Sequence, residues 1–167
     1  EAGYKLDATT GLRDVKGETD EEVDGEEASS SSTLTFTLTA VDSEEMSQVA
    51  TRIQEDLAKI GIEISLVLVP ADLMLAQVIE PKNFELLLMS ILLEGDPDPY
   101  PLWHSTQAKS GGLNFTGYNN ADADTLLTDG RKEMDETIRA QKYQQFGQLL
   151  AKDIPAVFLY QSRFAYV

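Results

Sequence analysis

The fold is decided by residues 33–70, which read TLTFTLTAVDSEEMSQVATRIQEDLAKIGIEISLVLVP. From residue 34 to 38, apolar side chains alternate with threonines, and this period of two predicts a strand. Apolar residues then recur at helical spacing over 46–60, which predicts an amphipathic helix. A second strand is predicted over 62–69. A strand, a helix and a strand in about forty residues predict a right-handed βαβ unit.

Four residues set the predicted ends of these elements. Asp42 is predicted to cap the helix, and Glu45 stands where a capping box needs its acidic partner. Gly61 is predicted to end the helix in the left-handed conformation. Pro70 stops the second strand because proline has no N–H to donate to a sheet.

The same two periodicities predict the remaining elements. They are a helix over 72–79, a nearly all-apolar strand over 84–92, a helix from Asn119 or Asn120 to Leu127, a helix capped by Asp135, and a closing strand over 154–160. An all-apolar strand is typical of a sheet that is covered on both faces. The alternation therefore predicts an α/β fold, with a mixed sheet and helices on both of its faces.

Composition excludes several classes of function. The chain has 167 residues, 42% of them hydrophobic and 25% charged, as in an ordinary globular protein. Acids outnumber bases 29 to 13, and the net charge of −16 argues against binding nucleic acid or an anionic membrane. Without cysteine the chain has no disulfides, no thiolate zinc site and no thiol nucleophile. No apolar run reaches the length of about eighteen residues that a membrane span needs.

The N-terminal part differs from the rest. Residues 1–13 are predicted to be the remnant of a preceding helix or turn, since the chain opens on Glu-Ala-Gly-Tyr and not on Met. Residues 14–33 carry eight acids against one lysine, followed by a run of serines. Such a segment has little to bury, so we expect a flexible, acidic, Ser-rich insertion. The ordered part is predicted to be 34–167.

The loop after the strand predicted over 84–92 is the richest candidate for a binding site, because ligands gather at the carboxyl ends of strands. The candidate ligand-binding residues of this loop and its continuation are Asp96, Asp98, Tyr100, Trp103, Asn114 and Tyr118. Carboxylates and amides beside aromatic rings make the mixed surface that small-molecule pockets use. Each residue also has a structural interpretation, since Asp-Pro steps start turns and a tryptophan can fill a core.

Other chemistry finds little support in the sequence. His104 is the only histidine, which excludes a His–His metal pair, and a lone histidine is expected to be exposed. Residues 120–124 resemble the start of an EF-hand loop, but Thr125 stands where that loop needs glycine. No glycine-rich phosphate loop is present. We therefore expect no enzyme, no metal and no cofactor.

Five motifs follow one another in a characteristic order. They are Ile60-Gly61-Ile62, DPDPYPLWHS at 96–105, NFTGYNN at 114–120, Asp124-x-Leu126-Leu127 with Arg139 and Tyr143, and DIPAVFLY at 153–160. This series resembles the peptide/nickel type of extracellular solute-binding protein (family 5) that serves ABC importers. The resemblance runs over nearly all of the chain.

The resemblance implies one lobe of a type II periplasmic binding protein-like fold. Residues 34–167 would then be the α/β ligand-binding lobe, excised from a longer two-lobe protein. The implied function is binding of a solute, above all an oligopeptide, for import by an ABC transporter. The implied partners are a small peptide or similar solute, the ABC permease and the first lobe of the same protein, which is missing here. The implied location is outside the cytoplasmic membrane, as a periplasmic protein or a lipoprotein.

The resemblance also suggests how the loop would hold a ligand. In peptide-binding members an aspartate there pairs with the N-terminal amine of the ligand. Alignment on Asp98 and Pro99 puts Gly95 at that place, with Asp96 beside it. The aromatic residues of the loop offer stacking surfaces instead.

Two alternatives stay open. A stand-alone hydrolase would use Asp96 and Asp98 as a carboxylate pair. An acidic protein-interaction module would be built on residues 14–27. Neither alternative explains the order of the five motifs.

Overall fold

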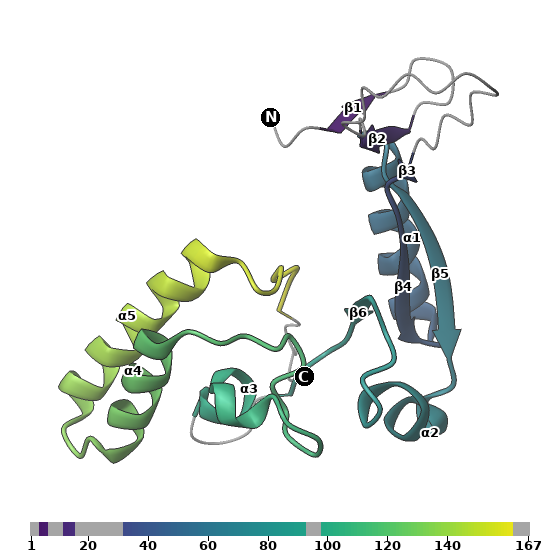
Figure 1. The fold of residues 1–167 in the computed structure, drawn as a ribbon. Helices are drawn as coiled ribbons and strands as arrows, with labels where there is room; N and C mark the ends of the chain where they lie inside the picture. The colour runs from purple at the N-terminus through teal and green to yellow at the C-terminus, as the bar shows by residue number, and fades with distance from the viewer. Residues whose placement is uncertain (1–3, 7–11, 16–31, 93–97, 162–167) are drawn as a thin grey trace, which may run out of the picture. The chain divides into compact units, whose positions relative to one another are not determined.

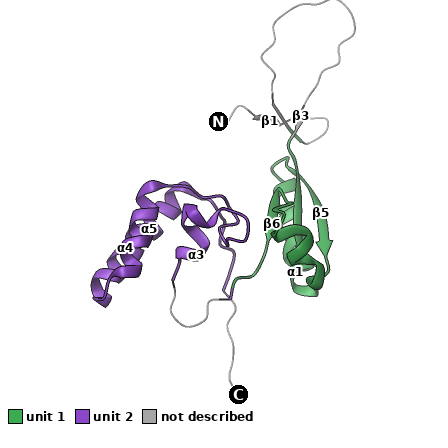
Figure 2. Ribbon diagram, turned by 60° about the horizontal axis from the view of Figure 1, so that its bottom comes forward, with its two compact units in different colours: residues 1–91 green, residues 92–167 purple. Residues whose placement is uncertain are grey.

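The computed structural model describes residues 4–6, 12–15, 32–92 and 98–161. The chain divides into two compact units, residues 1–91 and residues 92–167, which Figure 2 draws in different colours. The predicted ordered part, 34–167, is thus split between two units that have separate buried apolar clusters. We therefore describe each unit by itself.

The first unit contains a three-stranded parallel sheet in the order β5-β4-β6 (Figure 1). β4 (Thr35–Val41) is central, between β5 (Glu63–Val69) and β6 (Leu86–Leu88). Because α1 (Glu44–Ala58) connects the parallel strands β4 and β5, the predicted βαβ unit is confirmed. The α/β fold class is confirmed with it.

Helix α1 covers one face of this sheet. Leu38 lies opposite Leu66 on the neighbouring strand, and Ala40 lies opposite Leu88. These side chains share one buried cluster with Ala50 of the helix. The helix thereby buries the apolar face that its sequence periodicity predicted.

The ends of α1 confirm one predicted cap and correct another. Gly61 has φ 79° and follows the helix in the left-handed conformation, as predicted. The N-cap is Ser43, whose Oγ accepts from the N–H of Met46 at 3.3 Å. The predicted Asp42 is wrong by one residue, because both residue types can cap and only the backbone conformation decides between them.

A second helical segment packs on the opposite face of the sheet. It consists of α2 (Ala71–Met74) and a π-helical turn, η1 (Leu75–Ile79). Successive side chains of a strand point to opposite faces, so Val41 and Leu87 point away from α1. Both pack with this segment in a separate cluster. Helices therefore cover both faces, as predicted.

The predicted mixed sheet is not found in the described residues: the main sheet is all parallel, and the antiparallel strands form a separate small sheet. β1 (Tyr4–Leu6), β2 (Arg13–Val15) and β3 (Ser32–Thr33) pair in that order. Within the range 1–13, where a helical or turn remnant was expected, the described residues Tyr4–Leu6 and Arg13 are in strands. The backbone N–H of Arg13 donates to the carbonyl of Gly61 at 2.7 Å, which ties β2 to the end of α1. Most of the insertion predicted over 14–33 lies outside the described residues.

The second unit is helical in its described part. Its elements are α3 (Tyr100–Trp103), a 3₁₀ turn η2 (Ser105–Gln107), α4 (Ala121–Lys132) and α5 (Glu136–Asp153) (Figure 1). Asn120 caps α4 and Asp135 caps α5, so both predicted caps are confirmed. The helices enclose a cluster built around Trp103 and Leu127.

Two predicted strands are shorter or absent. The strand expected over 84–92 is reduced to Leu86–Leu88. The strand expected over 154–160 does not form, and Val157 and Phe158 are 76% and 74% exposed. An apolar sequence such as 154–160 predicts that the side chains are buried. A strand also needs a neighbouring strand to pair its backbone hydrogen bonds. None of the described strands pairs with 154–160.

No helix in the described ranges is long and apolar enough to cross a membrane.

Candidate functional site

Asn114 organises the loop that joins α3 to α4. Its side chain is fully buried, and Nδ2 donates to the carbonyls of Trp103, His104 and Tyr118 at 3.3, 3.2 and 2.9 Å. Its Oδ1 accepts from the N–H of Tyr118 at 3.2 Å and from the hydroxyl of Thr116 at 3.1 Å. The amide therefore replaces the regular hydrogen bonds that this irregular loop lacks.

Trp103 and Tyr118 lie beneath the loop in the core of this unit. Each is 8% exposed, and their rings meet edge to face with centroids 6.3 Å apart. The Tyr118 hydroxyl donates to Asp153 at 2.8 Å, and Asn120 donates to the same carboxylate oxygen at 2.8 Å. Burial, and then the bond to Asp153, raise the pKa of Tyr118 to about 12. The bonds from Tyr118 and Asn120 lower the pKa of Asp153.

Tyr100, His104 and Arg131 of α4 form a layered stack. The Tyr100 ring stacks on the His104 ring, with centroids 4.2 Å apart and an angle of 26° between the ring planes. The Arg131 guanidinium carbon lies 4.5 Å from the centre of the same Tyr100 ring. Arg131 Nε also forms an ion pair with Asp98 Oδ2 at 2.8 Å. The residues just before α3 are thus fastened to the last turn of α4.

His104 is buried, which corrects the expectation of an exposed histidine. Its Nδ1 accepts from the N–H of Thr106 at 3.2 Å, and its Nε2 lies 3.3 Å from the Thr128 hydroxyl. Both ring nitrogens of His104 thus have partners within this unit. Ser105 donates through its N–H at 2.9 Å and through its hydroxyl to Asp124, not to the histidine. No Ser–His relay is formed here.

The structure separates the predicted ligand-binding residues into two groups. Trp103, Asn114 and Tyr118 are buried and hold the loop in shape. Asp98 and Tyr100 are partly exposed and lie next to each other, with the N–H of Tyr100 donating to Asp98 Oδ1 at 3.1 Å. Asp96 lies outside the described residues. The distance between Asp96 and Asp98, on which a hydrolase would depend, is therefore not described.

Sequence reasoning missed several residues that complete the site. Arg131 and Asp124 come from α4, and Asp153 comes from the end of α5. Asp124 and Asp153 were noted only as members of motifs, and Arg131 was not singled out, because each meets the site through contacts between segments 19 to 35 residues apart. The one available signal was that Arg131 is one of only five arginines in a strongly acidic chain.

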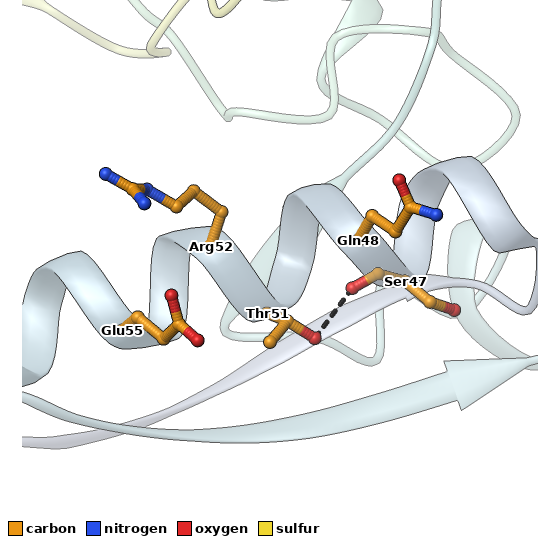
Figure 3. A pocket seen from close by; sticks show the side chains of 5 residues that line it. All are labelled: Ser47, Gln48, Thr51, Arg52 and Glu55. Carbon is orange, nitrogen blue, oxygen red and sulfur yellow. Dashed lines mark hydrogen bonds between the residues drawn. The ribbon is translucent and has the colours of Figure 1, made fainter.

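The structure has another shallow hollow, on α1 of the first unit (Figure 3). Its lining is Ser47, Gln48, Thr51, Arg52 and Glu55. All of these come from one helix, and Thr51 bonds back to the Ser47 carbonyl at 2.8 Å. This hollow is the ordinary polar surface of an amphipathic helix.

Comparisons with known proteins agree with the fold. No family model matches the chain. The chain is 34% identical over 155 residues to the oligopeptide-binding protein AppA of Bacillus subtilis, covering 92% of this chain and 27% of that protein. The structure of Bacillus subtilis AppA in complex with a nonapeptide matches with a TM-score of 0.76 and 30% identity, over 92% of this chain and 28% of that one. NikZ from Campylobacter jejuni, in complex with Ni(L-His), matches with a TM-score of 0.73 and 21% identity, over the same shares.

These matches confirm the resemblance drawn from the five motifs. The curated relative and the structural neighbours are solute-binding proteins of the peptide/nickel type. The chain spans only about a quarter of their length, 27% of the curated relative and 28% of each of the two structures. The correspondence therefore concerns one part of those proteins.

Proposed function

We propose that this chain, which corresponds in sequence and fold to one lobe of the family 5 solute-binding proteins, binds oligopeptides for import by an ABC transporter. The observation that carries the proposal is the 34% identity over 155 residues to an oligopeptide-binding protein. The fold supports it through the match to a structure solved with a nonapeptide. Because the related proteins are binding proteins, the proposed function is binding without catalysis and without a cofactor.

The proposed ligand face is the surface of residues 98–106. Asp98 and Tyr100 are partly exposed there, while Trp103, Asn114 and Tyr118 form the buried support. A site of this kind needs a rigid base, because a mobile loop would lose more entropy on binding. The hydrogen bonds of Asn114 provide that rigidity in a segment with little regular structure.

The proposed partners follow from the part of the relatives that the chain matches. A second lobe would supply the opposite wall of the cleft, and closure of two lobes excludes water from the ligand. An ABC permease would receive the loaded protein. The corresponding location is outside the cytoplasmic membrane, as a periplasmic protein or a lipoprotein.

An NMR titration of the 167-residue chain with short peptides tests this proposal. We expect the amide signals of residues 98–106 to shift, with a dissociation constant in the millimolar range, because one lobe contacts the ligand from one side only. The amide signals of α1 should not shift, and they provide the internal control. Failure of every peptide to shift the 98–106 signals would overturn the proposed function. A submicromolar affinity would contradict the need for a second lobe.

A further inference from the structure

Both carboxylate oxygens of Asp98 already have a partner within this unit. Its Oδ1 accepts from the backbone N–H of Tyr100 at 3.1 Å, and its Oδ2 pairs with Arg131 Nε at 2.8 Å. The Asp98 side chain is 24% exposed and the Arg131 side chain 49%. A ligand ammonium group would have to share a carboxylate whose charge Arg131 already balances.

The ring of Tyr100 is similarly occupied. His104 stacks on it at 4.2 Å, and the Arg131 guanidinium lies 4.5 Å from its centre. Two groups this close to one ring centre must lie on opposite faces. Neither face of Tyr100 can then stack on a ligand, and Arg131 is the outer, half-exposed layer of the stack.

We infer that Arg131 is the residue through which this loop contacts a ligand, and that Asp98 is its positioning partner. The inference rests on the proposed function and names the chemistry of that site. The guanidinium keeps its terminal N–H groups beyond the Nε that binds Asp98, and these groups donate to oxygen acceptors. Because Asp98 balances the charge of Arg131, the arrangement suits the neutral backbone carbonyls of a peptide and does not select for a free N-terminal amine.

The test uses one peptide, tetra-alanine, in free, N-acetylated and C-amidated forms. Each form is titrated by NMR into the 167-residue chain and into Arg131→Gln, Arg131→Lys and Asp98→Asn variants. Arg52→Gln is the matched control, because Arg52 is also an exposed arginine paired with an aspartate, Asp56, at 2.9 Å. Unchanged amide spectra away from the substituted residue show that each variant is folded.

We expect Arg131→Gln to raise the dissociation constant of all three peptides about fivefold, the net contribution of one ordinary hydrogen bond at a half-exposed side chain. Arg131→Lys should not restore binding, because a lysine has no planar fork. In Asp98→Asn the arginine charge is unbalanced, so C-amidation should weaken binding more than it does in the unmodified chain. The ratio of the affinities for free and N-acetylated peptide should be the same in the unmodified chain and in the Asp98→Asn variant.

Three results decide the inference. Peptide shifts at 98–106 that persist with equal affinity in Arg131→Gln would overturn it and leave the proposed function standing. An Asp98→Asn substitution that abolishes a preference for the free amine would identify Asp98 as an amine anchor and would also overturn it. Absence of binding by any form of the peptide would instead remove the proposed function on which the inference rests.

Discussion

Asn114 donates to three backbone carbonyls and accepts two further hydrogen bonds from a fully buried position. Removal of such a side chain leaves several backbone groups unpaired inside the protein, and each unpaired group has a desolvation cost. The candidate ligand loop therefore depends on a residue that a ligand cannot touch. The residues that support the site are therefore different from the residues that form its surface.

Asn114→Ala should destabilise the second unit by about 2–4 kcal/mol, because the carbonyls of Trp103, His104 and Tyr118 lose their common donor. Urea unfolding followed by tryptophan fluorescence measures this. Asn119→Ala is the matched control, since Asn119 is an exposed asparagine of the same loop. Equal midpoints for the two variants would show that the amide network contributes nothing.

Asp153 makes the stability of this unit depend on acid. The hydrogen bonds from Tyr118 and then Asn120 lower its pKa below the ordinary value of 3.8. A group whose pKa is depressed in the folded state stabilises that state above its unfolded pKa, and the contribution is lost as pH falls through the folded pKa. Stability of the unmodified chain should therefore fall below about pH 4.

Asp153→Asn should flatten that acid limb of the stability profile below about pH 4. The measurement is the urea midpoint at each pH. Asp129→Asn provides the control, because Asp129 forms only an exposed pair with Lys142 at 3.6 Å, and such pairs contribute little. A steep acid limb retained in Asp153→Asn would assign the acid dependence to other carboxylates.

At the scale of elements, two glycines in neighbouring helices have opposite surroundings. A Cβ added at Gly130 in α4 would come within 2.5 Å of the Tyr143 ring of α5. A Cβ added at Gly147 in α5 would meet nothing within 4 Å. The same substitution should thus report on helix packing at one position and on helix propensity at the other.

Gly130→Ala should lower the free energy of unfolding by about 1–3 kcal/mol, since the Tyr143 ring must shift, or α4 and α5 must separate, to admit the methyl group. Gly147→Ala should raise it by about 0.5–1 kcal/mol, because alanine has the higher helix propensity. Thermal unfolding followed by circular dichroism measures both. A stabilising Gly130→Ala would mean that α4 and α5 do not approach as closely as the structure shows.

Sequence patterns predicted the helices well and the strands near the C-terminus poorly. A helix satisfies its own hydrogen bonds, so periodicity and caps such as Asn120 and Asp135 determine it locally. The strand expected over 154–160 needs a partner that no local pattern specifies, and it does not form. The π-helical turn over 75–79 has no sequence signal of its own.

The candidate site likewise has a part that local sequence predicts and a part that depends on tertiary contacts. The loop itself was predicted from its composition, and its exposed pair, Asp98 and Tyr100, does lie together. The contact of Arg131 with both residues depends on how α4 packs against the loop. Tertiary packing of this kind brings together positions that are more than thirty residues apart, as 98 and 131 are. A single sequence contains no direct record of it.

At the scale of the whole molecule, the buried clusters belong to separate units. Two clusters, around Leu38 and around Val69, lie in residues 1–91. A third, around Leu127, lies in residues 92–167 and contains Trp103, the only tryptophan of the chain. Tryptophan fluorescence therefore reports on the second unit alone, whereas amide signals of β4 and β5 report on the first.

We expect the two units to unfold in separate transitions, because each buries its apolar side chains among its own residues. Leu127→Ala should lower the stability seen by fluorescence by about 2–5 kcal/mol, the cost of a cavity at a fully buried leucine. Leu88→Ala, at a buried leucine of the first unit, should move the transition of the β4 and β5 amides and leave the fluorescence transition in place. If Leu88→Ala shifts both transitions equally, the chain folds as one cooperative body, and the ligand face depends on the parallel sheet as well as on its own helices.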